Sequence, residues 1–345
     1  MNAFTAWSRI AIAALSSSMA VAGFASTPEP APPEPRRLAE GAWWLPGSHL
    51  PGRQPDGNTV VFEGPEGLVV LDTGRHPAHR QAILDLARRL GKPVAAIVNS
   101  HWHLDHVSGN PALKAAHPGA KVHASGAIDG AIAGFLEKSA ASMREMLAKP
   151  GLPAGVASDM RGDLATIANA RALRPDAVVA ASGAAMLAGR ELHLNLARDA
   201  ATEGDVWLYD PATRIAAVGD LVTLPAPFLD TACVEGWKAA LAQVWATPFE
   251  TLVPGHGHPM DRAAFARYRN AFEGFTTCAS SSRDAGDCAR EWSRAVSPLL
   301  AAAGQDPKRA EAMAAYYARE VLRPHPAGSR SCRAAGTAPG VRSRP

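Results

Sequence analysis

A run of potential metal ligands that directly follows an apolar segment constrains this chain more than any other feature. Residues 93–98 are almost entirely aliphatic, which is typical of a fully buried strand. If the chain leaves this strand in an extended conformation, His101, His103 and Asp105 project to one side, because extended side chains alternate with a period of two. His106 follows where the chain turns. Three imidazoles and one carboxylate in so short a stretch suit zinc and also accept iron or manganese, so the stretch predicts a metal site.

Length and composition indicate a globular protein around that site. A chain of 345 residues suffices for one large domain with additions or for two modest domains. Hydrophobic residues make up 47% of the chain and charged residues 19%, which favours a sizeable core and argues against global disorder. The net charge of +3 is weak and the arginines are scattered, so we expect no nucleic-acid partner.

The N-terminal segment has the pattern of an export signal. Arg9 precedes an apolar run of small residues, and the tripeptide at 23–25 resembles a signal-peptidase site. We therefore expect a signal peptide at residues 1–25, a proline-rich linker at 26–40, and a bacterial protein that is periplasmic or secreted. A single basic residue leaves an uncleaved anchor open, but the run is short for a membrane-spanning helix. We expect no stable membrane association after cleavage.

The chain contains four cysteines, none with the Cys-x-x-Cys spacing of a sulfur metal site. Cys278 and Cys288 flank a short polar loop, which predicts a local disulfide in an oxidising compartment; the alternative is two unrelated thiols. Cys233 and Cys332 either pair or stay free.

Several other predicted strands end in polar residues. Strands are expected before Asp72-Thr73-Gly74, before Gly219-Asp220 and before Gly255-His256-Gly257. Two groups of strands, each followed by helices, predict two stacked sheets covered by helices, with the site at one edge. A carboxylate in the place of Asp72 is suited to orienting a ligand rather than binding metal, although a simple turn residue has the same pattern. His76 and His79, before and on the following helix, are expected at the surface.

A helical pattern over about residues 127–172 contains no group with metal-ligand spacing, and we interpret it as an insertion that covers the mouth of the site. The main domain is expected over 41–275. Residues 276–345 are expected to form a helical C-terminal extension and a flexible tail.

Taken together, these motifs resemble the metallo-β-lactamase superfamily over roughly residues 41–275. The resemblance implies an α/β fold, the αββα sandwich of two mixed β-sheets flanked by helices. It also implies a first metal place on His101 and His103 and a second on Asp105, His106 and His256, with Asp220 between the two. The sites would hold one or two zinc ions, with iron or manganese as alternatives.

The activity that the resemblance implies is that of a hydrolase acting on a small molecule through a metal-bound hydroxide, since zinc lowers the pKa of bound water to about 7. Asp105 and Asp220 would be the catalytic carboxylates. The bond would be an ester, thioester, lactone or a related linkage. The lactamases of this superfamily more often have cysteine or serine at the place of Asp220. The alternatives are a β-lactamase, an iron-dependent dioxygenase of the same fold, and a catalytically degenerate metal-binding protein, although buried ligands are costly without a metal.

The chain departs from the superfamily pattern at one position. Ala201 stands where the resemblance predicts a third histidine of the first metal place. The sequence leaves three replacements open: Glu203, His193, or water in a weak or empty first place. We rank Glu203 above His193 because the latter lies farther along the preceding strand. His49 and Phe228 are among the candidates for the rim of the site, and the sequence does not predict the oligomeric state.

Overall fold

The computed structural model describes residues 32–328 and residue 332. The predicted signal peptide lies outside the described residues, as do the start of the linker and nearly all of the predicted tail. The end of the predicted linker is not irregular, because residues 36–39 form the first strand and pair with the next one. Among the helices that the structure describes, none is long and apolar enough to cross a membrane.

The first sheet has seven strands in the order of the sequence, β1 to β7. Its first four strands pair antiparallel, and β4 to β7 pair parallel, so the sheet is mixed. The strands β4 and β5 are apolar and nearly completely buried, as expected for strands covered on both faces. The strands are β1 (Arg36–Ala39), β2 (Ala42–Leu45), β3 (Thr59–Gly64), β4 (Gly67–Leu71), β5 (Val94–Val98), β6 (Lys121–Ala124) and β7 (Ala177–Val178).

The second sheet has five strands in the order β12-β11-β10-β9-β8. Only β11 and β12 pair parallel, and the other neighbours are antiparallel. An apolar layer that includes Phe62, Val98 and Leu208 packs between the two sheets. The prediction of two stacked mixed sheets is therefore confirmed. The strands are β8 (Gly183–Leu187), β9 (Arg190–Arg198), β10 (Gly204–Asp210), β11 (Ile215–Ala217) and β12 (Thr251–Val253).

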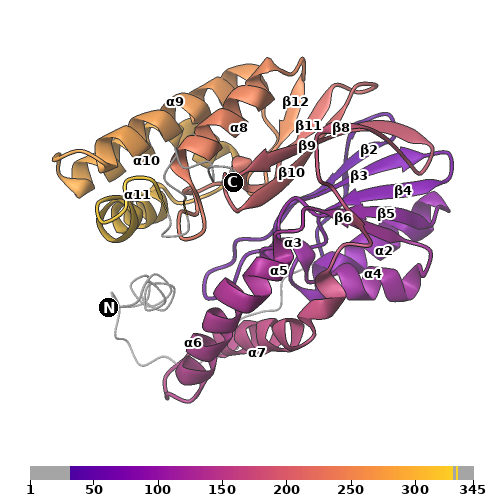
Figure 1. The fold of residues 1–345 in the computed structure, drawn as a ribbon, viewed down its shortest axis with the longest axis horizontal. Helices are drawn as coiled ribbons and strands as arrows, with labels where there is room; N and C mark the ends of the chain where they lie inside the picture. The colour runs from indigo at the N-terminus through magenta and orange to yellow at the C-terminus, as the bar shows by residue number, and fades with distance from the viewer. Residues whose placement is uncertain (1–31, 329–331, 333–345) are drawn as a thin grey trace, which may run out of the picture.

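Helices cover the outer face of each sheet (Figure 1). Helix α2 presents Ile83, Leu86 and Ala87 to the first sheet, which is the face that their helical spacing predicts. It ends at Gly91, whose φ of 64° is the left-handed conformation that glycine adopts most readily. The helices beside the two sheets are α2 (Pro77–Leu90), α3 (Leu104–Val107), α4 (Asn110–Ala116), η3 (Gly219–Leu221) and α8 (Val234–Ala246).

A helical segment between β6 and β7 projects from the sandwich beside α3 (Figure 1). It occupies the region in which the sequence predicts an insertion. Its first part packs on Trp102 and Leu104 of the metal-ligand stretch. Its elements are α5 (Ile128–Ala131), η1 (Ile132–Leu136), α6 (Glu137–Leu147), α7 (Ala154–Ala168) and η2 (Ala170–Leu173).

The C-terminal helices pack against α8 and the second sheet in one large apolar cluster. Helix α9 begins after the capping residue Asp261, so the boundary predicted at residue 275 falls inside a continuous helix. The structure bonds Cys278 to Cys288, as predicted, and pairs Cys233 with Cys332, which the sequence left open. The elements are α9 (Arg262–Ala279), α10 (Ala285–Ala302), α11 (Pro307–Tyr316) and η4 (Tyr317–Leu322).

Candidate metal centre

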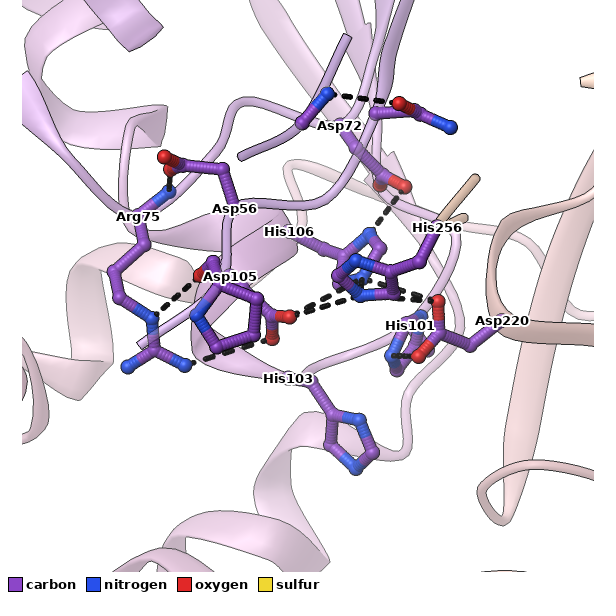
Figure 2. Close-up of polar contacts among 12 residues, drawn as sticks. Asp56, Asp72, Arg75, His101, His103, Asp105, His106, Asp220 and His256 are labelled. Atoms are coloured by element: carbon purple, nitrogen blue, oxygen red, sulfur yellow. Dashed lines mark hydrogen bonds and ion pairs between the residues drawn. The ribbon is translucent and has the colours of Figure 1, made fainter. Parts of the chain in front are cut away.

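The ends of four neighbouring strands bring the predicted ligands together. The stretch after β5 carries His101, Asp105 and His106, while Asp220 follows β11 and His256 follows β12. Asp72 follows β4 and lies behind the cluster (Figure 2). All of these side chains are buried. The site thus forms where the carboxyl ends of strands from both sheets converge.

Asp105, His106 and His256 form the more compact group. Their ligand atoms lie within 4.8 Å of one another. His256 Nε2 is 3.0 Å from Asp105 Oδ2 and 3.3 Å from His106 Nε2. Asp220 Oδ1 lies 3.3 Å from His106 Nε2 and 3.6 Å from His256 Nε2, so it faces the same centre and is counted in the compact group from here on. Two imidazole nitrogens and two carboxylates converge here.

His101, His106 and Asp220 form a second, looser group. His101 Nε2 lies 3.9 Å from Asp220 Oδ2, and no described residue hydrogen-bonds to this buried nitrogen. An unpaired buried polar atom is costly. His101 Nε2 faces Asp220 Oδ2, whereas Asp220 Oδ1 faces the compact group. The donor set and this nitrogen both fit a divalent metal ion.

His103 does not belong to either group. The sequence predicts that it shares one side with His101, and the two ring centroids are 4.4 Å apart; α3 begins at the next residue, Leu104. The His103 ring packs against Phe228, and its Nε2 lies 3.1 Å from Thr231 Oγ1. The structure therefore places His103 beside the site rather than among the converging ligand atoms.

Asp72 organises the ligands from behind. Its carboxylate lies 2.8 Å from His106 Nδ1 and accepts hydrogen bonds from both the backbone and the hydroxyl of Ser100. The bond to Nδ1 leaves His106 Nε2 free to face the centre, which is the orienting role predicted for this residue. Asp72 has a φ of 61°, an uncommon conformation for a residue other than glycine, and such strain is concentrated at functional sites.

The charges of the cluster depend on one another. Burial opposes the charged form of Asp105, but His106, His256 and Arg75 hold its pKa well below its usual range. Burial likewise lowers the pKa of His106, yet Asp220, Asp72 and Asp105 raise it well above 6.5. For His101, burial and the neighbouring His106 lower the pKa, so this ring is a neutral nitrogen donor.

The structure brings neither of the two side chains predicted to replace the missing histidine, Glu203 and His193, into the cluster. Ala201 is buried in the apolar cluster around α8, and its carbonyl accepts a hydrogen bond from Thr231. The Glu203 carboxylate instead accepts a hydrogen bond of 3.1 Å from Trp102 Nε1. His193 is partly exposed and lies beside Glu191 on β9. The looser group therefore has fewer ligands than the compact one.

A mostly aromatic wall rises beside the cluster. The ring centroids of Phe228 and His103 are 5.0 Å apart. Phe228 also lies near Phe135 of the insertion and Tyr317 of the C-terminal region. The centroid of the His49 ring lies 5.0 Å from that of His256, and burial lowers the pKa of His49 to about 3. The two parts outside the central sandwich thus meet at the site.

A buried network of charges next to the cluster was missed by sequence reasoning. His76 and His79, expected at the surface, are both buried. His76 bridges the carboxylates of Asp56 and Asp159, at 2.7 and 3.1 Å. His79 lies 2.8 Å from the Thr59 hydroxyl. The sequence predicts both the helix after His76 and the helical insertion, but not the contact between His76 and Asp159 of the insertion.

Comparison with protein families gives a match over residues 52–256, more than half of the chain, to the family described as the metallo-beta-lactamase superfamily. Over 49 residues, the chain is 47% identical to a hydroxyacylglutathione hydrolase of Gloeobacter violaceus. The aligned segment covers 14% of this chain and 19% of that protein. Over 50 residues, a linear primary-alkylsulfatase of Pseudomonas sp. is 40% identical to the chain. That segment covers 14% of this chain and 10% of the alkylsulfatase. The chain thus spans a fifth or less of these curated relatives.

Solved structures share the fold at low identity. A metallo-beta-lactamase from Pontibacter korlensis matches with a TM-score of 0.51 and 20% identity, covering 70% of this chain and 99% of that chain. A stereoselective inverting sec-alkylsulfatase from Pseudomonas sp. matches with a TM-score of 0.57 and 18% identity, covering 84% of this chain and 50% of that chain. At these identities the matches concern the fold alone.

Proposed function

The chain belongs to the metallo-β-lactamase superfamily, and we propose on that premise that it is a zinc-dependent hydrolase of an ester, thioester or lactone. The observation that carries the proposal is the convergence of buried imidazole and carboxylate atoms in the compact group. Similarity to a thioester hydrolase and to alkylsulfatases over short segments supports hydrolysis of an ester-type bond.

We propose one tightly held ion on Asp105, His106, His256 and Asp220. The looser place, with His101 and Asp220, offers fewer protein ligands and would bind a second ion weakly, because affinity depends on the number and geometry of ligands presented together. When bound, the zinc ion would lower the pKa of water and polarise the bond that is cleaved.

The protein residues would supply orientation and proton handling. Asp72 fixes the ring of His106, so that Nε2 faces the centre. Asp220 Oδ1 faces His106 and His256, whereas Oδ2 faces His101, and we assign to Oδ2 the acceptance of a proton during the attack of water. Asp105 holds the opposite side of the compact group, where it is paired with Arg75.

The substrate would have an apolar part. Phe228 and Phe135, both partly buried, present aromatic surface beside His103. Such a wall suits the apolar body of an ester or thioester. Two disulfides support the proposed location in the periplasm or outside the cell.

The test is hydrolysis by the purified protein after chelation and reloading with zinc, iron or manganese. The panel contains lactones, thioesters, carboxylic esters, alkyl sulfates and a β-lactam. Zinc-dependent turnover of an ester-type substrate, lost in His256→Ala, is expected. Turnover of the β-lactam alone would favour the lactamase alternative, and iron-dependent oxygen consumption would favour the dioxygenase. Metal binding without any turnover would overturn the enzymatic proposal in favour of a metal-binding protein.

A further inference from the structure

Arg75 connects a predicted metal ligand to the insertion. Its guanidinium group lies between two carboxylates, with Nη2 3.7 Å from Asp105 Oδ1 and Nη1 in contact with both oxygens of Asp163 (Figure 2 shows the side facing Asp105). Nε donates to the carbonyl oxygen of Pro55 at 3.0 Å, and the Arg75 backbone N–H donates to Asp56 Oδ1 at 2.6 Å. The side chain is therefore fixed at several points, and only 7% of it is exposed.

The two oxygens of the Asp105 carboxylate face different partners. Oδ1 faces Arg75, whereas Oδ2 lies 3.0 Å from His256 Nε2 and 3.8 Å from His106 Nε2. A carboxylate held at one oxygen cannot rotate freely about its terminal bond. The ion pair thus keeps Oδ2 aimed at the centre of the compact group.

The other end of the connection lies on α7 of the insertion. Asp163 and Asp159 are one helical turn apart and both are buried. Asp163 binds Arg75, while Asp159 binds Arg53 at 2.7 Å and lies near His76. The Asp163 contact leads directly to Arg75, which touches the predicted ligand Asp105. An arginine suits this place, because its planar group presents several donors in fixed directions, which a lysine ammonium does not.

We propose that Arg75 is a positioning residue for the metal ligand Asp105 and that α7 fixes Arg75 through Asp163, so that the insertion sets the metal affinity of the site. The inference rests on the proposed metal centre. Arg75 and Asp163 have opposite charges, so as a pair they add little net charge beside the ion. Their effect on the metal is therefore mainly directional, and the insertion becomes part of the ligand support rather than only a cover.

The test removes the pair without changing the net charge. Arg75→Met/Asp163→Leu replaces a buried ion pair by apolar side chains, a change that proteins commonly tolerate. The chelator-treated proteins are titrated with Co²⁺, whose visible absorption reports both the affinity and the geometry of its ligands. We expect a dissociation constant about 10- to 100-fold higher than that of the wild type, the usual effect of removing an outer partner of a ligand, together with an altered absorption spectrum.

Two single variants complete the design. Asp163→Asn leaves Arg75 unanchored and is expected to raise the dissociation constant for Co²⁺ about tenfold; it carries the test if the double variant does not fold. Asp159→Asn is the matched control, since it removes a buried carboxylate from the same helix but from a different contact. It is expected to change thermal stability and leave the Co²⁺ affinity within about twofold of wild type.

The outcomes separate this inference from the proposal on which it rests. An unchanged affinity and spectrum in the double variant, or equal losses of affinity in Asp159→Asn and Asp163→Asn, would overturn the role of Arg75 while the metal centre stands. Tighter binding by the double variant would mean that Arg75 acts only as a repelling charge. Failure of the wild-type protein to bind Co²⁺ or Zn²⁺ would overturn the metal centre itself.

Discussion

The buried histidine between α7 and the loop after β2 makes a strong prediction about stability and pH. His76 bridges Asp56 and Asp159, and its side chain is only 4% exposed. Burial alone lowers the pKa of His76, but the hydrogen bonds to the two carboxylates outweigh burial and raise it to about 9. In the unfolded chain the pKa is about 6.5.

The sign of the effect follows from the raised pKa. Between pH 6.5 and 9 the folded protein keeps a proton that the unfolded chain releases, so the free energy of unfolding falls as the pH rises through this window. The stabilisation is complete below pH 6.5 and is lost above about pH 9. At about 1.4 kcal/mol per pH unit the difference corresponds to about 3 kcal/mol, and solvent screening reduces our expectation to about 2 kcal/mol.

The assay compares wild type with His76→Gln, which cannot take up the charge. Urea unfolding of both chelator-treated proteins is followed by tryptophan fluorescence at pH 6, 7.5, 9 and 10, so that the titration of groups distant from His76 cancels in the difference. We expect the wild type to lose about 2 kcal/mol more than the variant across this range. Parallel pH dependences of the two proteins would refute the reasoning, because the titrating group would then not be His76.

Further predictions concern the site itself. His256→Ala is expected to lower the zinc content measured by elemental analysis. His193→Ala, on the partly exposed face of β9, is the control and is expected to leave the zinc content unchanged. Equal zinc content in both variants would contradict the ligand assignment. Glu203→Ala is expected to keep the zinc content, since its carboxylate binds Trp102, and a loss of zinc would restore Glu203 as a ligand. Phe228→Ala is expected to lower kcat/KM about tenfold for apolar substrates, and equal kinetics would remove Phe228 from the substrate wall.

The sequence predicts the sandwich well because the signals involved are local. A buried apolar run, followed by polar residues at the end of each strand, is visible without knowledge of the partner strands. The loop between Cys278 and Cys288 is equally local, and the structure bonds this pair. The orienting role of Asp72 was also predictable from its place at a strand end.

The sequence fails where the conformation or the partner is set by distant residues. His103 lies beside His101 as expected, with ring centroids 4.4 Å apart, but its Nε2 faces the hydroxyl of Thr231, which is far from it in the sequence. His76 and His79, before and on the helix that follows Asp72, were expected at the surface. His76 is buried against Asp159 of α7, which lies 83 residues farther along the chain, and no local pattern reports such a contact.

The most direct test of the central claim is a zinc titration of the chelator-treated wild-type protein, with hydrolysis of an ester-type substrate as the readout. If the compact group of Asp105, His106, His256 and Asp220 holds the functional ion, activity is expected to rise from near zero and level off at about one equivalent of zinc. Activity that persists after complete removal of the metal, or that never appears while zinc binds at one equivalent, would contradict the account.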